Sequence, residues 1–482
     1  MKIEYHKNLF YNIFYIYLLF YEGVMPRKAL VDKEKLQSDL LAYLRLHGVS
    51  SSQSLCIAFK ISQPTLSRML SLIKDKLLII GKAQDTKYAV CRKIEGTATP
   101  ISIYEIGEDG SSRLLGVLHA LAPQGFYFEG KIQETKSAFF HDLPYFLNDL
   151  RPNGFLGRFI PPQNKDLNLP KDIRLWTTEH SLEYLTCRGW NNIGNIIIGE
   201  KSFQLYLENS KSFPHAIHQK KREEQYPLYA NNIVAFGDPG SSAGGEQPKF
   251  ITLLLPENQH VLVKFSPPVN TEIGERIADI LICENIAHGV LKKNAQDTSD
   301  SEIFKYDNRI FLEVKRFDRI NKLGRRGLIS LGSLDAEFTA VLGTWSKAST
   351  ELIARKILPQ SFFEKIRWLE LFGDLIANTD MHFYNLSFFT KGQKIIDLAP
   401  AYDMSPMLFM PRNNQIIPIK FNPSLPSPTD GKIWNSVCCA ACEFWDNVLK
   451  DVRISNSFKE IALECKIKVT ELKSMAKLLP KN

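Results

Sequence analysis

The sequence predicts an α+β fold built from several domains. The chain has 482 residues, of which 44% are hydrophobic and 23% charged, and this length suits roughly two to four globular domains. From residue 31 to 91 the pattern is first helical and then extended. From residue 99 onward, short strand-like runs separated by Gly and charged turns come before further helices. We therefore expect a small front domain ahead of a larger mixed one.

Composition leaves most function classes open. Sixty Lys and Arg against 52 Asp and Glu give a net charge of +8, a mild excess that permits contact with phosphates without requiring it. The eight Cys follow no regular framework, which fits reduced thiols in a cytoplasmic protein. Cys439 and Cys442 form a CxxC motif, but no second Cys or His pair of metal-site spacing lies nearby. Zinc is therefore not expected.

Residues 9–24 are the one stretch that could suggest a membrane. The run LFYNIFYIYLLFYEGV is shorter than the roughly 20 apolar residues of a spanning helix, and Asn12 and four Tyr weaken it further. Met25 follows directly and opens a polar segment with helical periodicity. We therefore expect residues 1–24 to be a non-native or disordered extension, and we expect no membrane contact.

Residues 25–95 are predicted to form a winged helix-turn-helix. A first helix stops at Gly48, and its apolar face consists of Leu36, Leu40, Leu41 and Leu44. Ser50 to Ser52 can cap a second helix that runs to Phe59, and Ser62 can cap a third, in which Pro64 occupies the first turn. The run LLIIGKAQDTKYAVC then reads as two strands around a polar turn. Three helices followed by a hairpin are the elements of this DNA-binding module.

In such a module the third helix lies in the major groove. Its inner face is predicted to consist of Leu66, Met69, Leu70 and Ile73. The predicted DNA-contacting residues are Gln63, Thr65, Ser67 and Arg68 of this helix, with Lys82 and Lys87 in the wing. The alternative is that the module serves protein contacts or dimerisation, which would allow a homodimer.

A Gly-rich loop follows at residues 237–250, GDPGSSAGGEQPKF. Four Gly and two Ser within nine positions allow backbone N–H groups to converge on a phosphate. The loop does not match the P-loop pattern because no GK[ST] follows. Alone it is equally compatible with a surface turn.

The residues after the loop favour the phosphate interpretation. KFITLLLP and HVLVKFSPP read as paired strands, and Lys264 stands on a strand face that is otherwise apolar. A buried ammonium needs an anion, and Glu284 in the following helix can supply it, although Glu272 and Glu275 compete for this role. A Gly-rich hairpin, a strand Lys and a helix Glu form the nucleotide-holding half of a protein kinase. The alternative for Lys264 is an ordinary surface lysine.

Three polar residues further on complete this pattern. Asp380 and Asn385 have the Asp-x-x-x-x-Asn spacing of a kinase catalytic loop, in which the Asp orients the substrate hydroxyl and the Asn binds Mg²⁺. Asp403 follows the strand-like KIIDL and can reach the metal from another side. His382, between the first two, is expected to orient the loop. The HRD and DFG tripeptides of common protein kinases are absent.

These motifs together resemble one family. NTDMHFYNLSFF, LAPAYDMSP, VKRFDR and SSAGGEQPKF are similar to the HipA-like serine/threonine kinases of bacterial toxin-antitoxin systems. The resemblance runs from about residue 100 to the C-terminus. The fused front domain is similar to that of the YjjJ-type (HipH-type) members, whereas the DNA-binding partner of other members is a separate antitoxin.

The resemblance implies a role for each matched residue. Asp380 would be the catalytic base, Asn385 and Asp403 the Mg²⁺ ligands, and Lys264 the lysine at the ATP phosphates. Ser242 of the Gly-rich loop would be autophosphorylated, with Ser241 as its competitor. The KRFDR segment would join two lobes and contact adenine, although the family's usual Glu is replaced here by Lys315. The residues assigned to the ATP site are Lys249, Lys264, Glu284, Lys315, Phe317, Asn385 and Asp403.

The expected organisation is a front domain at 25–95, a β-rich N-lobe at 98–315 and a helical catalytic C-lobe at 316–482, in a kinase-like arrangement. The expected function is transfer of phosphate from ATP, with Mg²⁺, to a Ser or Thr of a protein. In some family members that protein is an aminoacyl-tRNA synthetase. Two alternatives remain: a transcriptional regulator whose kinase-like part only senses nucleotide, and a metal-dependent nuclease.

Overall fold

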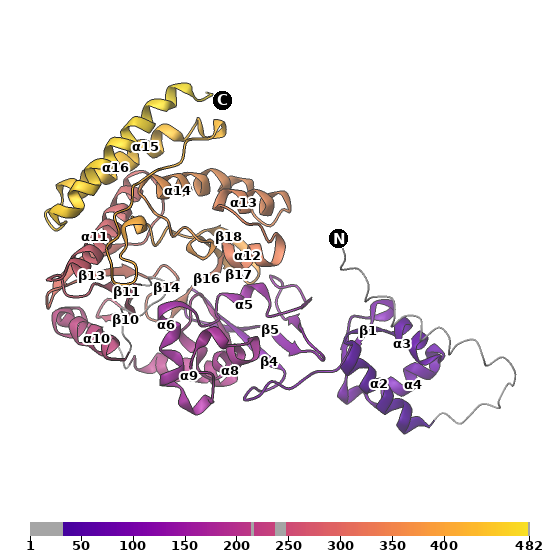
Figure 1. The fold of residues 1–482 in the computed structure, drawn as a ribbon. Helices are drawn as coiled ribbons and strands as arrows, with labels where there is room; N and C mark the ends of the chain where they lie inside the picture. Colours follow the sequence, from indigo (N-terminus) through magenta and orange to yellow (C-terminus); the bar gives the residue numbers. More distant parts are fainter. Residues whose placement is uncertain (1–31, 214–215, 237–246, 481–482) are drawn as a thin grey trace, which may run out of the picture. The chain divides into compact units, whose positions relative to one another are not determined.

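A computed structural model describes residues 32–213, 216–236 and 247–480 (Figure 1). The chain divides into two compact units, residues 1–92 with 121–123, and residues 93–120 with 124–482. The extension predicted at residues 1–24 lies outside the described residues. Within the described ranges, no helix combines the length and apolar character needed to cross a membrane.

The smaller unit contains the three predicted helices and the predicted hairpin. Asp32 and Ser51 cap the first two helices through side-chain hydrogen bonds, whereas Ser62 precedes the third without one. Leu66, Met69, Leu70 and Ile73 of the third helical segment are buried, as predicted. A short strand that the sequence did not predict pairs with the hairpin, giving the sheet order β1-β3-β2. The elements are α2 (Lys33–His47), β1 (Ser50–Ser51), α3 (Ser52–Phe59), α4 (Gln63–Leu72), β2 (Leu78–Ile80) and β3 (Lys87–Ala89).

The larger unit begins with an antiparallel sheet of order β7-β6-β5-β4-β8. Its three longest strands, ISIYEI, SRLLGVLHA and FYFEG, fall in the region where the sequence predicted short strand-like runs. The last strand returns beside β4 after a helical excursion. The elements are β4 (Ile101–Ile106), β5 (Ser112–Ala120), β6 (Phe126–Gly130), β7 (Ala138–Phe140), α8 (Thr178–Arg188), β8 (Ile196–Ile198) and α9 (Glu200–Lys211).

A second five-stranded sheet has the order β12-β13-β11-β10-β9. The predicted pair KFITLLL and QHVLVKF forms β10 and β11, which run antiparallel with Lys249 opposite Lys264. The long helix α11, predicted to carry Glu284, follows them directly. The elements are β9 (Ile217–His218), α10 (Arg222–Phe236), β10 (Lys249–Leu255), β11 (Gln259–Phe265), α11 (Glu272–Lys293), β12 (Ser301–Tyr306) and β13 (Arg309–Lys315).

The remainder of the described chain is mostly helical. A two-stranded hairpin precedes the helices. A small sheet of order β16-β17-β18 takes its first strand from before the helices and the other two from between them. One continuous apolar core extends from the first sheet through α11 to the last two long helices. The elements are β14 (Arg319–Ile320), β15 (Gly324–Arg325), β16 (Gly327–Ser330), α12 (Leu331–Phe338), α13 (Trp345–Ala354), α14 (Phe363–Leu375), β17 (Ser387–Lys391), β18 (Lys394–Leu398), α15 (Trp434–Lys450) and α16 (Asn456–Ser474).

Charged residues of the KRFDR segment join the first sheet to the hairpin. The Asp318 carboxylate, 5% exposed, accepts hydrogen bonds from Gly194 N at 2.9 Å and from Arg316 and Arg319 at 2.7 Å each. Arg319 also donates to Gly194 O at 2.8 Å. Although burial opposes it, the two guanidinium groups lower the pKa of Asp318. These contacts fix the loop before β8 against the start of β14.

Candidate functional site

Lys264 is buried in the second sheet with a carboxylate on each side. The side chain is 4% exposed, and its Nζ lies 2.7 Å from both Oε1 and Oε2 of Glu284 on α11. Glu284 is 1% exposed, whereas Glu272 and Glu275 face solvent on the same helix. The competition left open by the sequence is therefore resolved in favour of Glu284.

Asp403 provides the second carboxylate. Its Oδ1 lies 2.6 Å from Nζ of Lys264, and its side chain is 36% exposed, so one part of the carboxylate remains accessible. Its backbone has φ +54°, a left-handed conformation uncommon for residues other than Gly. Burial alone would lower the pKa of Lys264, but Asp403 and Glu284 raise it. Lys264 and Lys249 in turn lower the pKa of Asp403 against the effect of its burial.

Asn378 connects Asp403 to the loop that carries Asp380. Its Nδ2 donates to Asp403 O at 3.2 Å, and its Oδ1 accepts from Asp380 N at 3.0 Å. Asn385 closes the same loop by donating from Nδ2 to Asp380 O at 2.7 Å. These three bonds place Asp380, Asn385 and Asp403 in one connected polar network, although 23 residues separate the first from the last.

The loop is supported through backbone carbonyls. Trp345 Nε1 of α13 donates to His382 O at 3.1 Å, and Asn385 N donates to the same oxygen at 2.9 Å. The Tyr402 hydroxyl donates to Tyr384 O at 2.6 Å. The His382 imidazole was expected to orient the loop, but its Nε2 lies 3.9 Å from Asp380 Oδ1, beyond hydrogen-bond distance. His382 is instead held in the loop through its backbone carbonyl, which accepts both hydrogen bonds described above.

Asp380 is well placed to meet a ligand. Its side chain is 52% exposed, in contrast to Glu284. Burial of the remainder raises the pKa of Asp380, as does Asp403, whereas His382, Lys249 and Lys264 lower it. The carboxylate is thus an exposed hydrogen-bond acceptor at the rim of a site whose interior is charged.

The oxygen donors fit a magnesium ion. Asn385 uses its Nδ2 to bind Asp380 O, and its side-chain Oδ1 has no hydrogen bond to the described residues, so this oxygen is available for coordination. Asp403 contributes carboxylate oxygens, of which one contacts Lys264. Mg²⁺ prefers such oxygen ligands and takes only one or two carboxylates when phosphates supply the rest. Asn385 and Asp403 can therefore hold this ion together with a phosphorylated substrate.

The other predicted site residues vary in their placement. Lys249 lies opposite Lys264 on β10 and lies close enough to influence Asp380 and Asp403 electrostatically. Lys315 ends β13 with an exposed side chain, whereas Phe317 packs against Phe389 and Tyr402 at 6.0 and 5.7 Å between ring centroids. Ser241 and Ser242 lie outside the described residues.

The predicted DNA-contacting residues occupy the smaller unit. Gln63, Ser67 and Arg68 are exposed on α4, and Thr65 is half-buried. Lys82 lies between β2 and β3, and Lys87 begins β3; both side chains are exposed.

Two residues of the network were missed by sequence reasoning. Asn378 stands two positions before Asp380 in NTDMH, and Tyr402 directly precedes Asp403 in AYDMS. Each makes its contacts across the loop, from Asn378 to Asp403 and from Tyr402 to Tyr384. Their only sequence signal was proximity to the acidic residues.

Comparison with known proteins gives matches over most of the chain. A family model described as the YjjJ-like toxin, middle domain, matches residues 97–207, and one described as the HipA-like C-terminal domain matches residues 241–471. A curated relative, Toxin YjjJ of Escherichia coli (strain K12), is 33% identical over 441 residues, which cover 90% of this chain and 97% of the relative.

Two solved structures show more distant likeness. The first is the HipA toxin–antitoxin complex of Shewanella oneidensis MR-1 with HipB and operator DNA, with a TM-score of 0.45 and 15% identity over 78% of this chain and 95% of that one. The second is the proinflammatory kinase CtkA of Helicobacter pylori, with a TM-score of 0.35 and 13% identity over 50% of this chain and 93% of that one.

Proposed function

This chain belongs to the family of YjjJ-like toxins that carry a HipA-like C-terminal domain, and from that premise and the site geometry we propose that it is a serine/threonine protein kinase. The reaction is transfer of the γ-phosphoryl group of ATP to a protein hydroxyl in the presence of Mg²⁺. The family that the sequence motifs resemble is the same as the one whose models match the chain.

One observation carries the proposal. The buried ammonium of Lys264 contacts both Glu284 and Asp403, and hydrogen bonds through Asn378 continue from Asp403 to Asp380. A strand Lys paired with a helix Glu, an Asp and Asn five residues apart, and a later Asp are the parts from which protein kinases build their sites. Their convergence from four separate segments supports phosphoryl transfer over a simple turn or cap at each position.

Each of these side chains has a separate task in the proposed reaction. Lys264 supplies positive charge for the phosphate oxygens, and Glu284 holds that ammonium in position. Asp380, exposed at the rim, accepts the hydrogen bond of the acceptor hydroxyl and aligns its oxygen with the phosphorus. Asn378 and Asn385 fix the backbone of Asp380 on both sides, so that the carboxylate is oriented before the substrate arrives.

Asn385 and Asp403 are the residues that would hold Mg²⁺. When bound, the ion supplies neutralisation of the negative charge on the phosphate oxygens. Asp403 also contacts Lys264, so it would hold the Mg²⁺ ion and the lysine ammonium on the same side of the site.

Autophosphorylation gives the first test. The full-length protein is incubated with ATP and Mg²⁺ and its intact mass and peptides are measured. We expect one added phosphate on Ser242, which is absent in Ser242→Ala and retained in Ser241→Ala; the reverse result would assign the modification to Ser241. No added phosphate together with no ATP hydrolysis would contradict the kinase proposal and favour a regulator that only senses nucleotide.

The nuclease alternative is tested in the same preparation. Metal-dependent cleavage of DNA or RNA in the absence of ATP would support it, and Asp380 and Asp403 would then hold the metal. Under the kinase proposal, the buried Lys264 between two carboxylates serves the phosphates of ATP. No cleavage of nucleic acid is therefore expected without ATP.

A second function is proposed for the smaller unit. Its three helices and antiparallel strands fit a winged helix-turn-helix, and α4 presents Gln63, Ser67 and Arg68 to solvent while Leu66, Met69 and Leu70 are buried. We propose that α4 enters the major groove of duplex DNA. The test is binding of the full-length chain to duplex fragments over a range of salt concentrations. A linear fall of log affinity with log salt is expected, and no binding at low salt would remove the proposal.

A further inference from the structure

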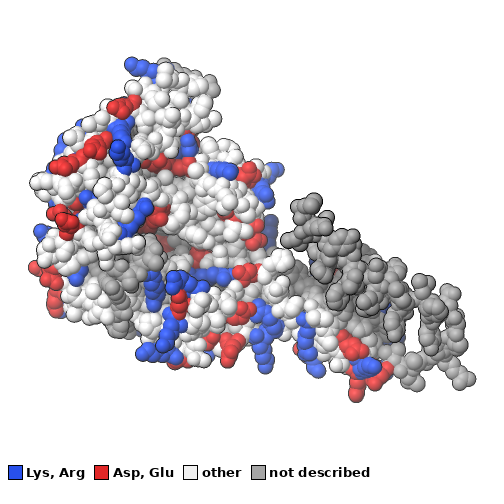
Figure 2. All heavy atoms as spheres, in the orientation of Figure 1, with Lys and Arg blue, Asp and Glu red and all other residues white. Residues whose placement is uncertain are grey.

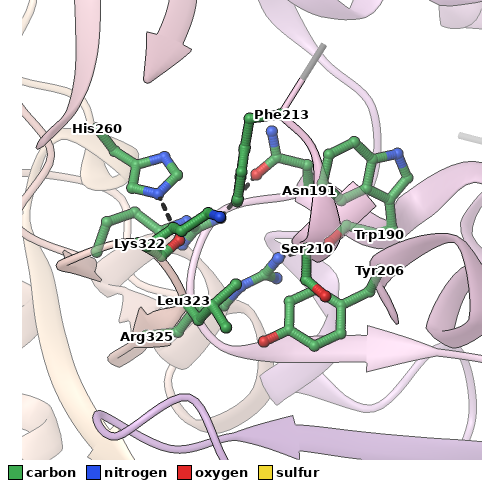
Figure 3. A pocket seen from close by; sticks show the side chains of 10 residues that line it. Trp190, Asn191, Tyr206, Ser210, Phe213, His260, Lys322, Leu323 and Arg325 are labelled. Carbon is green, nitrogen blue, oxygen red and sulfur yellow. Dashed lines mark hydrogen bonds between the residues drawn. The ribbon is translucent and has the colours of Figure 1, made fainter. Parts of the chain in front are cut away.

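A small pocket lies away from the kinase site, where the β14–β15 hairpin meets the α9 region (Figure 3). Its walls include three aromatic residues, Trp190, Tyr206 and Phe213, and the cationic residues Arg319, Lys322 and Arg325. His260 of β11 completes one side through a 3.1 Å hydrogen bond between Nε2 and Lys322 O. None of the lining residues is Asp or Glu.

Arg325 is the unusual residue of this pocket. It is 4% exposed, and its guanidinium lies 4.8 Å from the ring centroid of Tyr206, toward which it points in Figure 3. Its Nη2 donates to Trp190 O at 2.8 Å. Its Nη1 is buried and has no hydrogen-bond partner within the described chain. Burial lowers the pKa of Arg325 to about 10, so the group remains positively charged at neutral pH.

The positive charge of this pocket is not balanced by the protein. Asp318 is the nearby buried carboxylate, and it is bonded to Arg316 and Arg319. Glu108, further along the same surface, pairs with Arg326. Neither Arg325 nor Lys322 forms an ion pair with a carboxylate among the residues that the structure describes, and the Lys322 amino group instead lies 5.4 Å from the Phe213 ring centroid.

A water molecule could accept a hydrogen bond from Nη1, but it would leave the charge uncompensated. Burying a cation without a counter-ion is unfavourable, whereas an oxyanion supplies both the acceptor and the charge. The enclosed space is about 10 Å³, room for about one water-sized group. One oxygen of a larger anion fits it, with the rest of the anion outside and within reach of the flexible Lys322 side chain.

We propose that this pocket is a second anion site, which binds a phosphate group between Arg325 and Lys322. The ligand is inorganic phosphate or the phosphate of a larger molecule, because both present the same oxygens. The site takes residues from the segment 190–213 and from the β14–β15 hairpin, so a bound phosphate strengthens the junction that Asp318 and Arg319 already form.

Isothermal titration of the full-length protein at constant ionic strength tests the proposal, with inorganic phosphate in one arm and ribose 5-phosphate in the other. ATP is omitted, because its own phosphates would compete for this pocket; phosphate bound at the kinase site instead is recognised because the pocket variants leave it unchanged. We expect one binding event per chain, weakened by about tenfold or more in Lys322→Met and in Arg325→Met. The matched control is Arg174→Met, which removes an exposed charge paired with Asp172 and should bind as the wild type does.

Each outcome decides the proposal. Binding of phosphate itself identifies a small anion as sufficient, and binding of ribose 5-phosphate alone identifies the phosphate of a larger molecule. No binding in either arm, or binding that Lys322→Met leaves unchanged, overturns the proposal and leaves a water as the partner of Nη1. Lys322 is half-buried at the surface, so its variant remains informative if Arg325→Met fails to fold.

Discussion

Nζ of Lys264 and Oδ1 of Asp403 lie 2.6 Å apart, although 139 residues separate them in the chain. The same ammonium contacts Glu284 at 2.7 Å, so one buried cation joins β11, α11 and the segment that follows β18. This contact brings the second sheet and the helical part of the chain together at the proposed kinase site.

Replacing Lys264 by Met should destabilise the protein strongly. The change leaves the carboxylate of Glu284 buried without its cation, and breaking a buried ion pair in this way costs about 3–5 kcal/mol. Unfolding in urea measures this loss of unfolding free energy. Adding Glu284→Gln to Lys264→Met should recover part of the loss, because the uncompensated charge is removed. Lys315→Met, at an exposed position of β13, is the control and should change stability by less than about 0.5 kcal/mol; equal losses for both lysines would contradict the account.

Asp318→Asn should weaken the junction between the first sheet and the β14–β15 hairpin. The substitution removes the charge that Arg316 and Arg319 share and leaves Arg319 buried without a counter-ion. A loss of about 3–5 kcal/mol in unfolding free energy is expected. Asp172→Asn, which breaks an exposed pair with Arg174, should have little effect. If the two variants have the same melting temperature, the buried pair does not stabilise this junction.

His260 should make the protein less stable at mildly acidic pH. Burial, together with the charges of Arg319, Arg316 and Arg325, lowers the pKa of His260 to about 4 against the opposing effect of the hydrogen bond to Lys322 O. As the pH falls, the imidazole of His260 is therefore protonated in the unfolded chain before it is protonated in the folded one. The stabilisation that comes from the neutral imidazole is complete above about pH 6.5 and is lost as the pH falls toward the folded-state pKa.

Between pH 6 and pH 5 the wild type should lose about 1 kcal/mol more unfolding free energy than His260→Gln. Urea unfolding at the two pH values measures the difference. His141→Gln, at an exposed position, serves as the control and should follow the wild type. Parallel pH dependence of wild type and His260→Gln would show that His260 does not titrate differently on unfolding.

Arg68→Ala should weaken DNA binding and reduce its salt dependence. If the exposed Arg68 contacts a phosphate, its loss lowers the slope of log affinity against log salt by about one. Ser67→Ala, next to it on α4, should instead change affinity without a change in slope. Fluorescence anisotropy with labelled duplexes measures both, and an unchanged slope in Arg68→Ala would place this guanidinium away from the phosphates.

Local pattern was enough to predict much of this structure. The leucines of α2, the Ser at the start of α3 and the alternation in β10 and β11 specify their elements by period and capping, so these were predicted within a few residues. The pairing of Lys264 was also predictable, because a lysine on an apolar strand face needs a carboxylate. The choice of Glu284 among three glutamates required the helix to be placed against the sheet.

Contacts between distant segments were not predictable. Nothing in the KRFDR segment indicates that Asp318 bonds to Gly194, since 124 residues separate them. The pocket around Arg325 likewise arises from three segments, and each reads as ordinary surface in sequence. Asn378 escaped notice because an Asn in a loop is most often a local cap, whereas here it binds Asp403 from 25 residues away.

In the proposed mechanism, Asp380 aligns a hydroxyl for phosphoryl transfer. The most direct test compares intact mass after incubation with ATP and Mg²⁺ for the wild type and Asp380→Asn, with circular dichroism to establish that both are folded. The wild type should gain phosphate, and the variant, whose exposed side chain changes little in size, should gain it at least about 100-fold more slowly. Equal phosphorylation of both proteins would contradict the role of Asp380 and the proposed mechanism with it.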